Sequence, residues 1–262
     1  MSSFQGKFVW YELMTPDAAA SEAFYSSVVG WEARKADTPE MAYTVLSTAG
    51  NGVAGIMALS PRMIGDGAKP GWIGYIAVDD VDAQAKAVSA AGGAIHMGPA
   101  DIPGVGRFAM AADPQGIGFV LFKPVPPEGG VAVPAFATDV PGHAGWNELR
   151  TPALNPAFDF YARMFGWVES GTFDMGPTYG VYRMFGPGGE TIGGMMVNPP
   201  DASSGTYWKF YFNVDGIDAA GERIKAGGGR VTEGPHQVPG GTWTLQCADP
   251  QGVLFGLTSQ AK

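Results

Sequence analysis

The stretch Trp10-Tyr-Glu-Leu-Met-Thr-Pro16 returns later in the chain as Trp146-Asn-Glu-Leu-Arg-Thr-Pro152, 136 residues further on. Short motifs that follow it recur at the same offset. They are Phe24-Tyr25 with Phe160-Tyr161, and Gly30-Trp31 with Gly166-Trp167. Over residues 10–31 and their counterparts, 9 of 22 positions are identical. A match of this kind at a fixed spacing indicates an internal repeat.

A second, longer block carries the same relation. Residues 72–121 match residues 208–257 at 20 of 50 positions, including the sequence Asp-Pro-Gln-Gly at 113–116 and again at 249–252. Between the two blocks the alignment slips by three residues and then recovers. The chain is therefore a duplication of one ancestral unit.

The junction of the two copies is rich in proline and glycine. Residues 124–142 read PVPPEGGVAVPAFATDVPG and show neither helical nor strand periodicity, a composition typical of an extended connector. We therefore predict a first domain over 1–125, a linker over 126–141 and a second domain over 142–262.

Composition excludes several classes of protein. The 262 residues carry a formal net charge of −9, which argues against binding to nucleic acid. A single cysteine excludes a disulfide framework and a cysteine-built metal site. The sequence has no apolar run long enough for a membrane span and no secretory leader at its start, so we expect a cytoplasmic protein.

Each half shows the same order of predicted elements. In the first half, strands are expected over 8–14, 43–47 and 53–59, and a helix beginning at Asp17 ends at Gly30. A further strand over 72–78, a helix from Val81 to the glycines at 92 and 93, and strands over 108–112 and 117–122 follow. The pattern predicts an α+β fold with four related modules in the chain.

These motifs, in this order and twice over, resemble the vicinal oxygen chelate superfamily, which includes glyoxalase I, bleomycin resistance proteins and extradiol dioxygenases. The resemblance covers nearly the whole chain as a tandem two-domain form. It implies βαβββ modules, two in each domain, whose curved mixed sheets surround an open cavity. It leaves open whether the modules that share a cavity come from one half or from both.

The resemblance also implies a divalent metal, but the positions that hold the metal in this superfamily carry no histidine or carboxylate in this chain. The position on the first strand falls on Trp10 and Trp146, and the position before the second helix falls on Ile73 and Lys209. The position after Asp-Pro-Gln-Gly falls on Val120 and Gly256, and 53–59 and 192–197 contain neither histidine nor carboxylate. Divalent metals need three or four such donors. We therefore predict no metal and no cofactor.

The three histidines do not change this prediction. His143 borders the connector, and His96 and His236 flank Gly-Pro sequences. We expect all three to lie in loops exposed to water.

The cavity is expected to be lined by the side chains that alternate with these positions. Glu12 and Glu148 are the candidate catalytic residues, as general acids or bases. The candidate ligand-binding residues are Trp10, Met57, Tyr75, Trp146, Met196, Lys209 and Tyr211.

Each of these residues also has a structural interpretation. The glutamates could be buried carboxylates hydrogen-bonded to the backbone or to a tyrosine. The tryptophans and methionines could fill the core. Cys247, which aligns with Ala111, is interpreted as a small buried thiol rather than a nucleophile.

Two functions remain as hypotheses. The first is a glyoxalase-like protein that has lost its metal and binds a small organic molecule in an aromatic cleft. The second is a metal-independent isomerase, lyase or hydrolase that uses Glu12 or Glu148; a metal-dependent glyoxalase or dioxygenase is opposed by the missing ligands. Since the duplication supplies an internal pseudo-dimer, we expect a monomer.

Overall fold

The structure, a computed structural model, describes residues 4–36, 42–125, 134–198 and 205–262. The first half contains β1 (Phe8–Thr15), α1 (Ala18–Val29), β2 (Glu32–Lys35), β3 (Tyr43–Thr48), β4 (Asn51–Ala58), α2 (Pro61–Gly65), β5 (Gly71–Ala77), α3 (Val81–Ala90), β6 (Ala94–Ile102), β7 (Gly106–Ala112) and β8 (Gly118–Pro124). The second half contains β9 (Ala144–Thr151), α4 (Leu154–Phe165), β10 (Trp167–Asp174), α5 (Gly176–Tyr179), β11 (Val181–Pro187), β12 (Gly193–Val197), β13 (Tyr207–Asn213), α6 (Ile217–Ala226), β14 (Arg230–Gln237), β15 (Trp243–Ala248) and β16 (Leu254–Ser259).

Each half forms one mixed sheet of eight strands. The strand order is β2-β3-β4-β1-β5-β8-β7-β6 in the first half and β10-β11-β12-β9-β13-β16-β15-β14 in the second. β1 pairs in parallel with β4, and β5 with β8, whereas β6, β7 and β8 pair antiparallel. The α+β class and the repeated βαβββ modules are confirmed.

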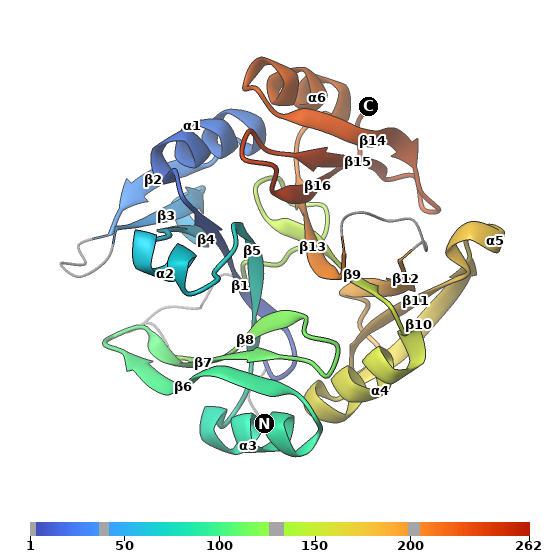
Figure 1. The fold of residues 1–262 in the computed structure, drawn as a ribbon. Helices are drawn as coiled ribbons and strands as arrows, with labels where there is room; N and C mark the ends of the chain where they lie inside the picture. The colour runs from blue at the N-terminus through green and yellow to red at the C-terminus, as the bar shows by residue number, and fades with distance from the viewer. Residues whose placement is uncertain (1–3, 37–41, 126–133, 199–204) are drawn as a thin grey trace. The chain divides into compact units, whose positions relative to one another are not determined.

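The compact units of the molecule do not coincide with the two halves of the sequence. Of the described residues, the first unit contains 4–9, 74–125, 147–198 and 205–208, and the second contains 10–36, 42–73, 134–146 and 209–262. Within the second unit α1 lies beside α6, and within the first unit α3 lies beside α4 (Figure 1). Each unit is thus built from one module of each half. The domain limits predicted above stay a prediction, and residues 126–133 of the expected linker lie outside the described residues.

Three buried side chains connect the two halves inside the second unit. Tyr25 on α1 accepts a hydrogen bond from Trp72 Nε1 on β5 at 3.0 Å, and its hydroxyl donates to Asp249 Oδ2 at 3.3 Å. Burial, followed by the charge of Asp249, raises the pKa of Tyr25 well above its ordinary value, so the hydroxyl keeps its proton. Asp249 Oδ1 in turn accepts from the amides of Gln251 at 2.9 Å and Val253 at 2.8 Å.

The first unit repeats this arrangement with the halves exchanged. Trp208 Nε1 on β13 donates to the Tyr161 hydroxyl on α4 at 3.1 Å. Burial and the charge of Asp113 raise the pKa of Tyr161, and Asp113 Oδ1 accepts from the amides of Gln115 and Ile117 at 2.8 and 2.9 Å. We call these two sets the tyrosine bridges: Trp72, Tyr25 and Asp249, and Trp208, Tyr161 and Asp113.

The glutamine of each Asp-Pro-Gln-Gly turn makes a second link between the halves. Thr15 Oγ1 donates to Gln251 Oε1 at 2.5 Å, and Gln251 Nε2 donates to Ser21 Oγ at 2.7 Å. In the first unit, Thr151 Oγ1 donates to Gln115 Oε1. The repeated motifs Thr-Pro and Asp-Pro-Gln-Gly therefore bind each other, which explains their recurrence without any role in chemistry.

The Gly-Trp pairs end the first helix of each half and fix the strand that follows. Gly30 ends α1 with φ of 88°, a left-handed conformation that favours glycine. Trp31 Nε1 donates to the carbonyl of Gly142 at 2.6 Å, and Trp167 Nε1 donates to that of Gly6 at 2.6 Å. Each indole therefore anchors a segment of the other half.

Aromatic rings fill the core of each unit. In the second unit Phe212 on β13 lies with its ring centroid 4.8 Å from Trp31, 4.9 Å from Trp72 and 6.1 Å from Tyr11. In the first unit Trp167 stacks on Phe185 at 4.3 Å. These strands thus use one face for the core, which leaves the alternate side chains on the other face.

The structure corrects the prediction for the histidines. His96 lies within β6 and His236 within β14, two strands that the sequence did not indicate because their side chains are mostly exposed and lack an apolar face. Both histidines are exposed, as expected, but His143 is buried, and its amide donates to the Val140 carbonyl.

Among the helices of the described residues, none combines the length and apolar character that crossing a membrane requires.

The tyrosine bridges give the first prediction. Tyr25→Phe or Tyr161→Phe leaves a buried indole N–H without its acceptor and should lower the free energy of unfolding by about 1–3 kcal/mol in denaturant titrations. Tyr179→Phe is the control, because its half-exposed ring remains over Arg150 after the hydroxyl is removed; its effect should stay within about 0.5 kcal/mol. Equal effects of all three changes would contradict the bridges' role.

Cys247 gives the second prediction. Its side chain is buried, and burial raises the pKa of the thiol to about 12. An unfolded thiol ionises near pH 8.5, so the unfolded state loses its proton first and the free energy of unfolding should fall as pH rises from about 8.5 to 12. Cys247→Ala should remove this component of the pH dependence.

Thiol labelling tests the burial of Cys247 separately. A disulfide reagent at pH 8 should label the thiol only after unfolding, and rapid labelling of the native protein would show that the thiol is not buried.

Candidate ligand-binding site

A cluster of polar and aromatic side chains lies on the first strand of the first half and its neighbours. Trp10 Nε1 on β1 donates to the Tyr43 hydroxyl on β3 at 2.9 Å, and this hydroxyl is hydrogen-bonded to Glu12. Glu12 is only 7% exposed. Burial first, and then the carboxylate of Glu12, raise the pKa of Tyr43 well above its ordinary value, so Tyr43 donates to Glu12 at any physiological pH.

A glycine makes room for this tyrosine. Gly55 on β4 is the direct register partner of Glu12. A Cβ atom at Gly55 would lie 2.0 Å from the hydroxyl oxygen of Tyr43, so no larger residue fits while the tyrosine holds this position. Met57, two residues along β4, is the register partner of Tyr43. We name Trp10, Glu12, Tyr43, Gly55 and Met57 the first-half cluster.

The second half carries a corresponding arrangement with more charge. Glu148 on β9 is 6% exposed and accepts from Arg150 Nε at 2.8 Å and from the Tyr182 hydroxyl at 3.4 Å. Its register partner on β12 is Gly194, where a Cβ atom would lie 2.0 Å from the ring of Tyr182. The register partner of Arg150 is the buried Met196. Glu148, Arg150, Tyr182, Gly194 and Met196 form the second-half cluster.

The arginine distinguishes the two clusters. Arg150 stands where the first half has Met14, and its guanidinium lies 6.0 Å from the ring centroid of Tyr179 on α5. Burying an ion pair removes both charges from water, and hydrogen bonds must compensate for this cost. Here the hydrogen bonds from Arg150 and Tyr182 to Glu148 provide that compensation. The second-half cluster is therefore the more polar of the two.

The remaining predicted residues lie on β5, β9 and β13. Tyr75 on β5 is buried with its ring centroid 5.5 Å from that of Phe122. Lys209 on β13 is 3% exposed and donates to Gln246 Oε1, and Tyr211 packs its ring over Gly256. Trp146 is half-buried on β9. The structure thus brings Trp10, Glu12 and Met57 into one cluster and Glu148 and Met196 into the other, and their roles stay predictions.

Sequence reasoning missed the two tyrosines, the arginine and the two glycines. Tyr43 and Tyr182 correspond to each other at an offset of 139 rather than 136, because they fall where the alignment slips by three residues. Each tyrosine lies two strands from its glutamate with a glycine on the strand between, a relation that can be recognised only when the strand order is known.

The residues present do not fit the divalent metal that the resemblance implies. Trp10 uses its N–H for Tyr43, Val120 is buried, and Gly256 lies under the ring of Tyr211. Over the described residues, no three or more His, Cys, Asp or Glu side chains gather closely enough to hold a metal ion.

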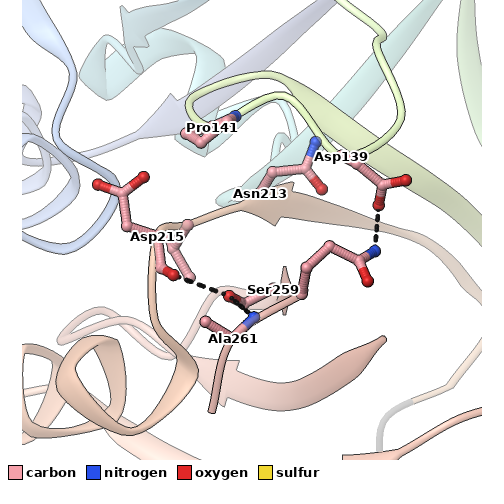
Figure 2. A pocket seen from close by; sticks show the side chains of 8 residues that line it. Asp139, Pro141, Asn213, Asp215, Ser259 and Ala261 are labelled. Carbon is pink, nitrogen blue, oxygen red and sulfur yellow. Dashed lines mark hydrogen bonds between the residues drawn. The ribbon is translucent and has the colours of Figure 1, made fainter. Parts of the chain in front are cut away.

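A separate cavity of about 250 Å³ lies in the second unit at the ends of β13 and β16, next to 134–141 (Figure 2). Its polar side chains serve the local structure. Asn213 Nδ2 donates to the carbonyls of Ala137 and Val140, and Gln260 Nε2 donates to Asp139. Ser259 Oγ donates to the carbonyl of Asp215. None of the residues that we predicted for the site lines it.

Comparisons with known proteins identify the family. The model of the Glyoxalase/Bleomycin resistance protein/Dioxygenase superfamily matches residues 7–121 and again residues 141–257. The chain is 32% identical to the anthracycline biosynthesis protein DnrV of Streptomyces peucetius, covering 96% of this chain and 92% of that protein. It is also 32% identical to the putative glyoxylase CFP32 of Mycobacterium tuberculosis, covering 98% and 96%.

Solved structures share the fold. The Mn(II)-bound glyoxalase from Novosphingobium aromaticivorans aligns over 99% of this chain and 83% of its own, with a TM-score of 0.63 and 17% identity. The 2,2',3-trihydroxybiphenyl 1,2-dioxygenase from Sphingomonas wittichii aligns over 98% and 91%, with a TM-score of 0.67 and 12% identity. The chain therefore belongs to the Glyoxalase/Bleomycin resistance protein/Dioxygenase superfamily, as a tandem pair of its domains.

Proposed function

We propose that this protein binds a small, flat organic molecule without a metal ion, on the sheet faces that carry the first-half and second-half clusters. The observation that carries the proposal is the repeated buried glutamate with its tyrosine held over a glycine. A carboxylate and a phenol side by side can accept from and donate to hydroxyl or carbonyl groups of a ligand. Trp10 and the methionines Met57 and Met196 supply the aromatic and adaptable apolar contacts that such a molecule needs.

The name of one relative supports a ligand of this kind. That relative is named for anthracycline biosynthesis. Anthracyclines are fused-ring aromatic molecules with hydroxyl and carbonyl groups, which suits a site of tyrosine, tryptophan and glutamate. In this function the protein acts as a monomer, because its internal duplication replaces a second chain.

A second candidate is a metal-independent isomerase, lyase or hydrolase. Glu148 favours it, because a buried carboxylate beside the hydroxyl of Tyr182 can take a proton from a ligand carbon or oxygen and return it. Arg150 Nε donates to the same carboxylate at 2.8 Å and would fix its orientation toward a ligand. A metal-dependent glyoxalase or dioxygenase reaction is disfavoured by the absence of a fitting donor set among the described residues.

Ligand binding is tested by quenching of tryptophan fluorescence. Titration with an anthracycline or with a neutral two-ring aromatic ester should give a saturable signal. Glu12→Gln and Glu148→Gln should each weaken binding severalfold, because the hydrogen-bonding group changes while its size is kept, and the double variant should weaken it further. The exposed Glu222→Gln is the control. No saturable change up to about 1 mM of either compound would contradict the proposal.

The same variants decide between binding and catalysis. If the protein is an enzyme of the second kind, loss of turnover in Glu148→Gln should exceed its loss of affinity by at least about tenfold, because a proton-transfer group acts mainly in the transition state. Unchanged turnover in both single variants and in the double variant would remove the glutamates from catalysis.

The glycines test the geometry of the clusters. Gly194→Ala places a methyl group where the ring of Tyr182 lies, so it should displace the tyrosine and reduce ligand affinity by about tenfold or more. Gly98→Ala on β6 meets no atom within 4 Å and should leave affinity unchanged. Equal affinity of the two variants, both folded by circular dichroism, would show that the tyrosine's position does not matter.

A further inference from the structure

An exposed aromatic ring lies beside the second-half cluster, at the edge of its sheet. Phe173 on β10 is the register partner of Tyr182 on β11, the tyrosine whose hydroxyl donates to Glu148. Directly paired residues of antiparallel strands project from the same face of a sheet, so Phe173 lies on the face that carries the cluster. Phe173 is 41% exposed. The face that we propose for ligand binding therefore extends to β10 and presents an aromatic ring there.

Glycines keep this face of the sheet low. One row of register partners crosses it, formed by Gly171 on β10, Met184 on β11, Gly194 on β12 and Glu148 on β9. A Cβ atom at Gly171 would lie 2.6 Å from Met184 Cε, and one at Gly194 would lie 2.0 Å from the ring of Tyr182. The half-buried side chains of Met184 and Tyr182 thus lie over the glycines of the neighbouring strands. They form a floor against which a planar molecule can pack.

The connection between β10 and β11 covers the other end of this face. The short helix α5 stands at the tip of this hairpin (Figure 1). Its last residue, Tyr179, has its ring centroid 6.0 Å from Cζ of Arg150. Arg150 is two residues from Glu148 on β9, so its side chain lies on the cluster face and Tyr179 lies over that face. Tyr179 therefore covers the end at β9, whereas the end at Phe173 is exposed.

The edge strand of the first half has a different surface. β2 reads Glu-Ala-Arg-Lys, a charged sequence of the kind that protects a sheet edge from other strands. The residue beside Tyr43 is Ala36, whose amide donates to the Tyr43 carbonyl at 2.9 Å. Alanine thus stands in the first half where the second half has Phe173. The fold does not require the phenylalanine, which at an exposed edge increases the risk of aggregation.

We propose that Phe173, Met184 and the ring of Tyr182 form a subsite that holds the outer ring of a ligand with two or more fused rings. The other end of the ligand lies at the second-half cluster. The backbones of β9 and β10 are three strand spacings apart, about 14 Å, so fused rings contact residues of both strands better than a single ring does. This inference rests on the proposed function, of which it specifies the ligand's length and the half that binds it.

Two neutral probes with the same polar groups test the inference: methyl 4-hydroxybenzoate, which has one ring, and methyl 6-hydroxy-2-naphthoate, which has two. Calorimetry gives their dissociation constants for the unmodified protein, Phe173→Ala and Phe173→Tyr. The binding event of the second half is the one that Glu148→Gln weakens. For this event, Phe173→Ala should weaken the two-ring probe about threefold to tenfold and the one-ring probe less than about twofold, because only the longer probe reaches the ring. Phe173→Tyr keeps the ring and should bind both probes as the unmodified protein does.

Val181→Ala is the matched control. Val181 is 48% exposed and precedes Tyr182 on β11, so it lies on the opposite face of the sheet. This variant should leave both dissociation constants unchanged. Sedimentation velocity of the ligand-free variants tests the alternative that Phe173 contacts a second copy of the chain, and circular dichroism checks that each variant is folded.

The outcomes separate the two proposals. If Phe173→Ala weakens both probes equally or weakens neither, or if Val181→Ala has the same effect, the subsite is overturned while ligand binding stands. A dimer that Phe173→Ala converts to a monomer would assign the ring to an interface between protein chains and would also overturn the subsite. Binding of neither probe by the unmodified protein, up to about 1 mM, would overturn the subsite together with the proposal that the protein binds flat organic molecules.

Discussion

The hydrogen bond between a buried tyrosine hydroxyl and a tryptophan indole, beside an aspartate of the other half, is the interaction on which the rest of this structure depends. Tyr25 joins Trp72 to Asp249 in one unit, and Tyr161 lies between Trp208 and Asp113 in the other. Each aspartate in turn holds its own turn together through two backbone amides. A unit therefore needs a helix from one half and a turn from the other, so each unit depends on both copies of the duplication.

This constraint also determines which side chains remain for a ligand. Because Tyr11 and Phe212 occupy the aromatic core of the second unit, the alternate residues of β1 and β13 must lie on the other face of their strands. Glu12 and Lys209 are among these alternate residues. The motifs by which the family is recognised thus serve the fold, whereas the residues between them carry the differences in chemistry.

The sequence predicted the duplication, the modules and the main helices because these depend on strong local signals. Gly30 and Gly166 end helices with positive φ, and the Asp-Pro-Gln-Gly turns follow from aspartate accepting nearby amides. Strands such as β6 and β14 were missed because they lie at sheet edges with mostly exposed side chains. The tyrosines of the clusters were missed because their positions depend on a glycine on a neighbouring strand, a relation that appears only once strands are paired.

Hydrogen exchange of backbone amides in Tyr25→Phe tests the central claim most directly, which is that each unit is completed by both halves. Under conditions where exchange proceeds by local opening, we expect faster exchange at Gln251 and Val253, in the second half, because the carboxylate of Asp249 loses the hydroxyl that holds it. The amides of Gln115 and Ile117, which belong to the same half as Tyr25, should keep their protection. Faster exchange at Gln115 and Ile117 with unchanged protection at Gln251 and Val253 would contradict the account.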